Sequence, residues 1–146
     1  HVALSCGQRL WRRTGGGLVS AHVLVVEDDP LSQRLMRDVL QVHGYDVLVA
    51  GTAEEGLASA RARMPDLVLM DIRLPGMDGF AALDALRTSA ETASVPVLAV
   101  TASVMLGERE KILNAGFDGY HPKPIQIPQL LAEVAHFVAS GRKSGA

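Results

Sequence analysis

The sequence predicts a doubly wound α/β fold, in which five helices cover the two faces of a parallel sheet of five strands. Three observations predict it. Short apolar runs alternate along the chain with longer segments whose apolar residues recur at helical spacing. The runs VLVV and LVLM are apolar without interruption, as in strands buried on both faces of a parallel sheet. Turn residues bound the runs, and there is no internal repeat.

The first strand is predicted at 22–26. The Asp29-Pro30 pair behind it is typical of a helix start, because an acidic side chain caps the first turn and proline fits the first helical position. Apolar residues then recur at helical spacing from Leu31 to Leu40, and Gly44 lies where the helix should end.

A second strand is predicted at 45–50. Thr52 and Glu55 have the spacing of a capping box, which indicates a second helix that ends near Pro65. The third strand, 67–71, is followed by a cluster of proline, glycine and aspartate residues that forces a turn.

Asp78 is expected to cap a third helix. A fourth strand opens at Pro96 and ends on Thr101, and a fourth helix is predicted from about Ser103 to Ala115. These two elements complete four repeats of strand and helix.

The fifth strand is predicted at 119–121. It is followed by Pro122, which suits the edge of a sheet because proline cannot donate a hydrogen bond to a neighbouring strand. Pro128 starts the last helix, which carries an apolar face, and the tail from Gly141 is polar.

The composition bounds the class of protein. With 146 residues, 48% hydrophobic and 21% charged, the chain has the size and balance of one soluble globular domain. A net charge of −2 gives no general field for nucleic acid or an anionic membrane, so we expect direct binding to neither. No apolar stretch approaches the roughly 18 residues that span a bilayer. The single cysteine, Cys6, excludes an intramolecular disulfide and agrees with a cytoplasmic location.

Residues 1–20 differ from the rest of the chain. They lack an initiator Met, carry arginines around Trp11 and then have three consecutive glycines at 15–17. We interpret them as a flexible segment: a tag, a cloning remnant or a linker, with a basic arm that docks on a partner as the alternative. The domain is expected at 21–140, followed by a disordered tail at 141–146.

Acidic residues follow two of the predicted strands. Glu27 and Asp28 come directly after the first strand, and Asp71 ends the third. If the strands are parallel, these carboxylates share one edge of the sheet, where α/β folds place their sites. Their mutual repulsion then requires a cation, a shared proton or solvation. Asp29 is explained by helix capping alone.

The candidate metal ligands are all oxygen atoms, which favours a hard cation such as Mg²⁺. Lys123 and Thr101 follow other predicted strands and add an ammonium and a hydroxyl at the same edge. Such a set of groups predicts a receptor for a phosphoryl group, with Asp71 as the nucleophile.

The chain from about Ala21 to Ser140 resembles the receiver domain of a two-component response regulator. Four motifs carry the resemblance: the acid pair of VVEDDP, the aspartate of LMDIRLPGMDG, the hydroxyl of AVTAS and the lysine of GYHPKPI. Any one of them is weak, but four in the order and at the separations of the family are specific. The resemblance implies the flavodoxin-like strand order 2-1-3-4-5.

The resemblance also implies a role for each site residue. Glu27, Asp28 and Asp71 would bind Mg²⁺ together with the backbone carbonyl of Arg73. Asp71 would accept a phosphoryl group from a phosphohistidine, and Lys123, followed by a cis bond to Pro124, would contact that phosphate.

Two further residues would form a switch. Thr101 would move toward the phosphate after transfer, and Tyr120 would turn inward into the space that it leaves. The surface formed by the fourth helix, the fifth strand and the fifth helix would then contact a downstream protein, and His121 could face that partner.

The implied partners are a histidine kinase or a histidine phosphotransfer protein, and the implied state is a monomer or weak dimer. The chain resembles both single-domain regulators and receivers of hybrid kinases. It is expected to be no enzyme beyond its own phosphorylation and dephosphorylation. The alternatives are a phosphohydrolase that forms an aspartyl phosphate, against which Arg73 argues because such enzymes place a second acid there, and a receiver-like scaffold without phosphorylation.

Overall fold

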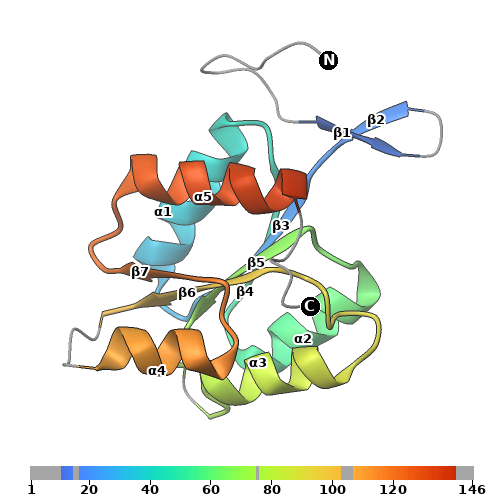
Figure 1. The fold of residues 1–146 in the computed structure, drawn as a ribbon. Coiled ribbons are helices and arrows are strands. Elements are labelled where there is room, and N and C mark those ends of the chain that lie inside the picture. Colours follow the sequence, from blue (N-terminus) through green and yellow to red (C-terminus); the bar gives the residue numbers. More distant parts are fainter. Residues whose placement is uncertain (1–10, 15–16, 75, 103–106, 141–146) are drawn as a thin grey trace.

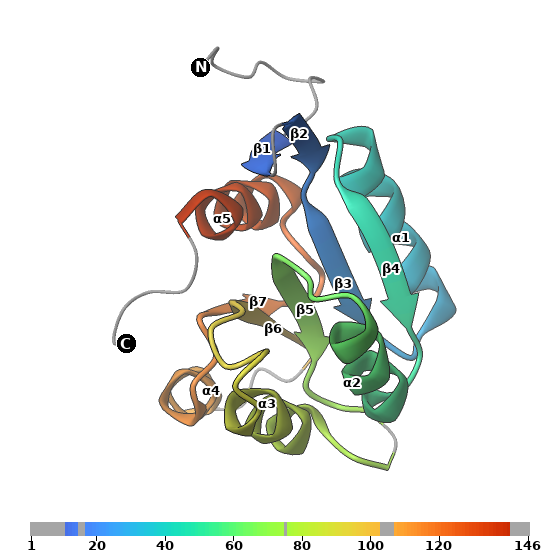
Figure 2. The ribbon, with the colours of Figure 1, turned by 90° about the vertical axis from the view of Figure 1, so that its right-hand side faces the viewer.

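The computed structural model describes residues 11–14, 17–74, 76–102 and 107–140, and it confirms the predicted fold (Figure 1). Five parallel strands form one sheet in the spatial order β4-β3-β5-β6-β7, which is the order 2-1-3-4-5 of the predicted strands. The strands are β3 (His22–Val26), β4 (Asp46–Ala50), β5 (Leu67–Asp71), β6 (Val97–Thr101) and β7 (Gly119–Pro122). Figure 2 shows β3, β4 and β5 running in the same direction.

Helices cover both faces of this sheet. They are α1 (Pro30–Val42), α2 (Ala53–Ala62), α3 (Gly79–Thr88), α4 (Glu108–Ala115) and α5 (Ile127–Ser140). Helices α1 and α5 lie on one face, and α2, α3 and α4 lie on the other (Figure 1). Met36, Leu40 and Phe137 are buried beneath the first pair, and Leu83 and Ile112 beneath the other three helices. Every residue of β3, β5 and β6 is buried, as predicted for strands covered on both faces.

The predicted helix starts are confirmed by their hydrogen bonds. The side chain of Asp29 accepts from the backbone N–H of Ser32 (2.9 Å), and Asp78 caps α3 in the same way. Thr52 Oγ1 accepts from Glu55 N (3.1 Å), but the Glu55 carboxylate accepts from the N–H of Gly51 (2.9 Å). Glu55 therefore ties the preceding loop to the helix start.

Helix α4 begins later than predicted. Its described bounds are Glu108–Ala115, after Gly107 at a φ of 80°. A residue in this left-handed conformation cannot continue a right-handed helix, so a helix from Ser103 through Ala115 is wrong at this residue. Residues 103–106 lie outside the described part of the chain.

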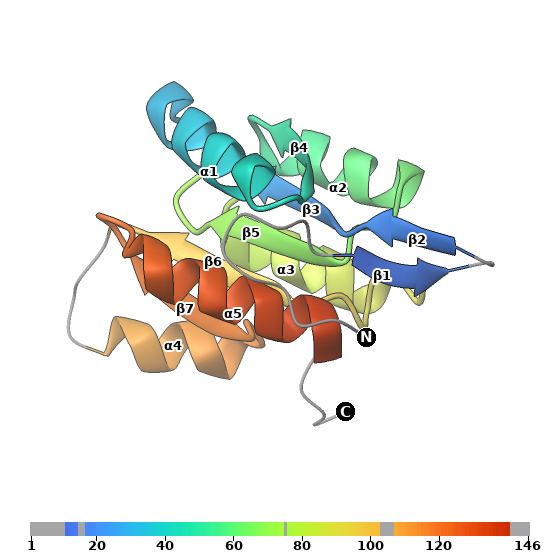
Figure 3. The same ribbon diagram turned by 90° about the horizontal axis from the view of Figure 1, so that it is seen from above.

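Two strands that the sequence did not predict precede the five-stranded sheet. Strands β1 (Trp11–Thr14) and β2 (Gly17–Ser20) pair antiparallel as a separate two-stranded sheet, and β2 leads directly into β3 (Figure 3). Two glycines between short runs are a hairpin signal, although glycine-rich sequence is also typical of a flexible linker. The expectations for residues 1–10 and 141–146 fall outside the described residues.

The helices in the described ranges are too short, or too polar, to cross a bilayer. Within these ranges the chain therefore contains no candidate membrane span.

Candidate functional site

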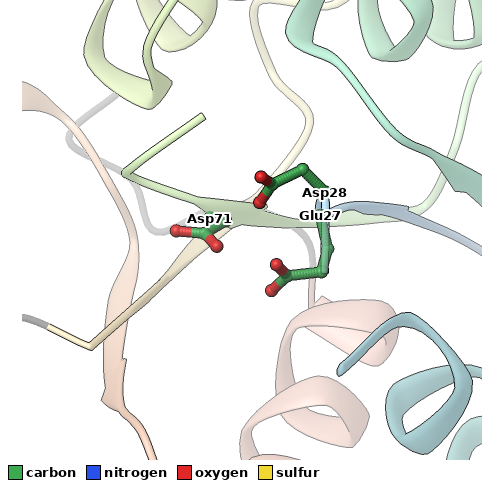
Figure 4. A group of neighbouring side chains, drawn as sticks. All are labelled: Glu27, Asp28 and Asp71. Carbon is green, nitrogen blue, oxygen red and sulfur yellow. The ribbon is translucent and has the colours of Figure 1, made fainter. Parts of the chain in front are cut away.

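The predicted acidic residues meet at the carboxyl edge of the sheet. Glu27 and Asp28 follow β3, and Asp71 ends the adjacent strand β5, because Val26 is paired with Met70 across the two strands. One oxygen from each of the three carboxylates lies within 4.8 Å of the others. Figure 4 shows the three side chains at these neighbouring strand ends. The central geometric prediction from the sequence is confirmed.

Glu27 is the most deeply buried member of the group. Its relative exposure is 0%, its Oε2 accepts from the N–H of Asp29 (3.0 Å), and its Oε1 accepts from Lys123 Nζ (2.8 Å). The Gln33 side chain on α1 donates to the Glu27 carbonyl oxygen (2.5 Å). The position of Glu27 is therefore held by the loop, by the helix and by a residue 96 positions away.

Asp71 is 6% exposed and has its two oxygens held differently. Oδ1 accepts from the backbone N–H of Arg73 (2.8 Å), and Oδ2 accepts from Lys123 Nζ (3.2 Å). Lys123 thus bridges Asp71 and Glu27 with one ammonium group. The peptide bond between Lys123 and Pro124 is cis, as the resemblance implied.

One ammonium between two acids leaves negative charge at the site. Burial raises the pKa of Glu27 to about 7, the hydrogen bond from Lys123 acts against this rise, and the nearby Asp71 adds to it. Burial by itself would lower the pKa of Lys123, but Glu27 and Asp71 together outweigh it and raise that pKa. Lys123 therefore stays charged, and the pKa of Glu27 lies well above that of an ordinary carboxyl group. A further positive charge would complete the balance.

The donor set fits a magnesium ion. The three carboxylates offer only oxygen, the ligand that hard cations prefer, and Asp28 is exposed while the other two are buried. Among the described residues this is the one group of three or more potential metal ligands that converge in this way. Glu27, Asp28 and Asp71 are therefore the residues that would hold the ion.

The other predicted site residues lie around this group. Thr101 is fully buried at the end of β6, and its carbonyl oxygen accepts from the N–H of Lys123 (2.7 Å). Tyr120 is half-buried in β7 and packs against the core on the α4 side. The register is set by the pairing of Thr101 with Pro122, so the edge position expected for this proline is confirmed. Arg73 is exposed and contacts Asp71 through its N–H.

Sequence reasoning missed Gln33 and Gly79. Gly79 is the first residue of α3, and a Cβ at this position would lie 2.8 Å from both the carbonyl oxygen of Asp71 and the Cα of Ile72. Only glycine allows the helix to start this close to Asp71. The Asp-Gly pair at 78–79 indicated a turn, but nothing in it indicated this contact.

Comparison with known proteins agrees with this geometry. Residues 23–135 match the response regulator receiver domain, and the chain belongs to this family. It is 36% identical over 120 residues to the polar-differentiation response regulator DivK of Brucella ovis, covering 82% of this chain and 98% of that protein.

Solved structures show the same fold. The chemotaxis response regulator CheY4 of Vibrio cholerae is 28% identical, with a TM-score of 0.74 over 80% of this chain and 97% of that one. The receiver domain of the sensor histidine kinase PA1611 from Pseudomonas aeruginosa is 31% identical, with a TM-score of 0.76 over 83% of this chain and 99% of that one. That domain holds a magnesium ion in its active-site cleft.

Proposed function

We propose that this chain is the phosphoacceptor of a two-component phosphorelay, with Asp71 as the residue that takes the phosphoryl group. The donor is a phosphohistidine on a histidine kinase or a histidine phosphotransfer protein. The observation that carries the proposal is the Lys123 ammonium, which lies 2.8 Å from Glu27 and 3.2 Å from Asp71 beside the exposed Asp28.

The chemistry follows from these contacts. A carboxylate oxygen of Asp71 forms the new bond to phosphorus as the bond from phosphorus to the donor imidazole nitrogen breaks. Glu27, Asp28, Asp71 and the carbonyl of Arg73 would hold Mg²⁺, which would neutralise charge on the transferred group when bound. Lys123 contributes a second positive charge, and its contact with Asp71 Oδ2 supports a role beside the phosphate. The catalysis is limited to the phosphorylation and dephosphorylation of the chain itself.

Phosphorylation would change the surface formed by α4, β7 and α5, and a downstream protein would recognise this change. Thr101 turns toward the new phosphate, and Tyr120 moves into the space that becomes available, which changes the surface offered to a downstream protein. Their positions at the end of β6 and in the adjoining β7 support this coupling. The chain acts in the cytoplasm as a monomer or weak dimer, without direct contact to nucleic acid or membrane.

Helix α1 presents a docking surface for the phosphodonor. Leu31 is 76% exposed and Leu35, one turn later, is 46% exposed, and the helix begins two residues after Asp28. Leucines at a spacing of four share one face of a helix, so they form an apolar contact at the border of the site. This position suits a helical partner that must bring its histidine to Asp71.

Phosphorylation by a small donor tests the proposal. We expect incubation with Mg²⁺ and acetyl phosphate to add the mass of one phosphoryl group, and the Asp71→Ala variant to add none. Asp84→Ala, which removes an exposed acid of α3, is the matched control and should be modified like the wild type. Modification that persists in Asp71→Ala, or no modification of either protein, would overturn the assignment.

The same experiment separates the alternatives. Sustained rapid turnover of the donor would indicate a phosphohydrolase, and the absence of any phosphoryl adduct would indicate a scaffold. Arg73, where such hydrolases place a second acid, opposes the first alternative, and the carboxylate cluster with Lys123 opposes the second.

A further inference from the structure

A pocket of about 450 Å³ lies between the edge strand β7 and helix α5, away from the carboxylate cluster. Tyr120, His121, Gln129, Glu133 and His136 supply its polar lining. In Figure 1, α5 lies above β7 along the edge of the sheet. The site described above uses none of these residues except Tyr120.

Glu133 is seated in this pocket by the strand beneath it. Its Oε1 accepts a hydrogen bond from His121 Nε2 (2.6 Å), and the side chain of His121 is only 9% exposed. A Cβ at Gly119 would meet the same carboxylate, with its Oε1 at 2.3 Å and its Cδ at 2.8 Å. The absence of a side chain at Gly119 therefore leaves the room in which the carboxylate lies. A carboxylate held in this way is fixed before any ligand arrives.

The remaining groups determine which ligand fits. The side chain of Glu133 is 34% exposed, and among the described residues none donates a hydrogen bond to its second oxygen. No lysine or arginine lines the pocket, and the group that meets its one carboxylate is the imidazole of His121. Gln129 adds an amide, and Tyr120 and His136 add aromatic rings. A fixed carboxylate, together with an amide and two aromatic rings in the same lining, favours a planar cation with several donors, which is a guanidinium group.

We propose that this pocket binds an arginine side chain of the downstream protein partner. The guanidinium donates to the second oxygen of Glu133 and to the Gln129 amide oxygen, and it stacks on the rings of Tyr120 or His136. The pocket volume accommodates the long arginine stem together with the guanidinium. Assigning the arginine to a downstream partner rests on the function proposed above, whereas binding of the side chain does not.

The pocket is connected to the phosphoacceptor site through β7. Tyr120 lines the pocket, and Lys123, which contacts Asp71, follows His121 by two residues. An arginine bound here lies against the strand whose carboxyl end holds Lys123. This places the ligand where a movement of Tyr120 alters the lining.

A titration with a small probe tests the binding. We expect N-acetyl-arginine amide to bind the unphosphorylated full chain with a dissociation constant of roughly 1–10 mM and to shift the amide NMR signals of residues 119–121 and 129–136. The matching lysine compound should bind more weakly, and the uncharged citrulline compound should not bind. Glu133→Gln, which keeps an acceptor for His121, should weaken arginine binding about tenfold. Glu110→Gln, an exposed acid of α4, is the control and should leave it unchanged.

Two further variants complete the test. Gly119→Ala displaces the Glu133 carboxylate and should also weaken binding, with the dispersion of the NMR spectrum showing whether it is folded. Asp71→Ala should bind arginine like the wild type, so a failure of phosphorylation and a failure of this pocket are distinguished. Equal binding of arginine and citrulline, wild-type affinity in Glu133→Gln, or shifts only outside the pocket would each overturn the proposal.

Discussion

Glu27 is the residue whose environment differs most from that of an ordinary surface acid. It is fully buried and shares one ammonium with Asp71, and burial raises its pKa to about 7. Such a group suits a cation site that must be stable when empty, because a proton can replace the missing charge.

The pH dependence of stability should report this proton. In the unfolded chain Glu27 loses its proton near pH 4.5, whereas in the metal-free folded protein it keeps the proton to about pH 7. Between these values the folded state binds the extra proton, so this group makes the free energy of unfolding fall as pH rises. The slope from one proton is at most about 1.4 kcal/mol per pH unit, and it disappears above pH 7.

The Glu27→Gln variant isolates this contribution. We expect the difference in unfolding free energy between variant and wild type, measured by urea unfolding in EDTA, to shift in favour of the variant from pH 5 to pH 7. Addition of Mg²⁺ at pH 8 should stabilise the wild type more than the variant. Glu110→Gln should follow the wild type at every pH, and parallel curves for Glu27→Gln and the wild type would contradict the assigned pKa.

The close packing around Gly79 leads to a second prediction at the scale of one residue. Because an added Cβ would lie 2.8 Å from backbone atoms of Asp71 and Ile72, Gly79→Ala must displace α3 or the loop that carries Asp71. We expect a loss of about 1–3 kcal/mol in unfolding free energy and slower phosphorylation by acetyl phosphate. Gly51→Ala is the control, since its Cβ would make only ordinary contacts at 3.5 and 3.7 Å. Equal stability of the two variants would show that the loop adapts freely.

At the scale of elements, α1 separates its apolar residues between two faces. Met36 and Leu40 are buried against the sheet, while Leu31, Leu35 and Val42 are exposed. Leu31 and Leu35 lie in the half of α1 that begins beside the carboxylates, whereas Val42 lies at the far end of the helix. One face of α1 therefore packs against the sheet, and a second apolar face is exposed near the site.

The positions of these exposed residues predict which of them contact the phosphodonor protein. We expect Leu31→Ser with Leu35→Ser to lower the rate of phosphotransfer from a histidine kinase or phosphotransfer protein by about tenfold or more. Phosphorylation by acetyl phosphate should be unchanged, because that donor needs no docking surface. Val42→Ser, at the other end of the helix, should transfer at the wild-type rate. A loss with both kinds of donor would instead point to damage at Asp71.

At the scale of the whole molecule, one buried ion pair joins several elements. Arg87, at the end of α3, donates to Asp118 (2.9 Å) and to the carbonyl oxygens of Val95 (2.6 Å) and Gly116 (3.3 Å). Asp118 in turn accepts from the N–H of Val97 at the start of β6 (2.9 Å). The side chains of the pair are 15% and 6% exposed. The pair therefore anchors α3 to the segments that enter β6 and β7.

Removing one partner of this ion pair should destabilise the folded protein strongly. We expect Arg87→Met to lower the free energy of unfolding by about 3–5 kcal/mol, because the buried Asp118 loses its counter-charge. The exposed pair of Arg63 and Asp46, whose side chains are 52% and 45% exposed, offers the contrast. Arg63→Met should cost at most about 1 kcal/mol. Similar losses in both variants under urea unfolding would mean that burial does not govern these pairs.

Local patterns determined the elements and the placement of the acids. Apolar runs marked four of the five strands, capping residues such as Asp29 and Asp78 marked the helix starts, and acids such as Asp71 at strand ends predicted the cluster. These signals are visible because periodicity and turn chemistry act over a few residues. The late start of α4 and the strands β1 and β2 were missed because glycines favour several conformations, and only the folded chain selects one.

The sequence by itself determined that three carboxylates and a lysine reach one edge of a parallel sheet, since strand order and strand ends follow from the local pattern and the family motifs. The tertiary structure alone decided that Lys123 bridges Glu27 and Asp71, across separations of 96 and 52 residues, and that Glu27 is buried enough for a raised pKa. It also decided that Gly119 makes room for the Glu133 carboxylate. Such contacts depend on register and helix packing to within an ångström, and residue spacing along a chain carries no information at that resolution.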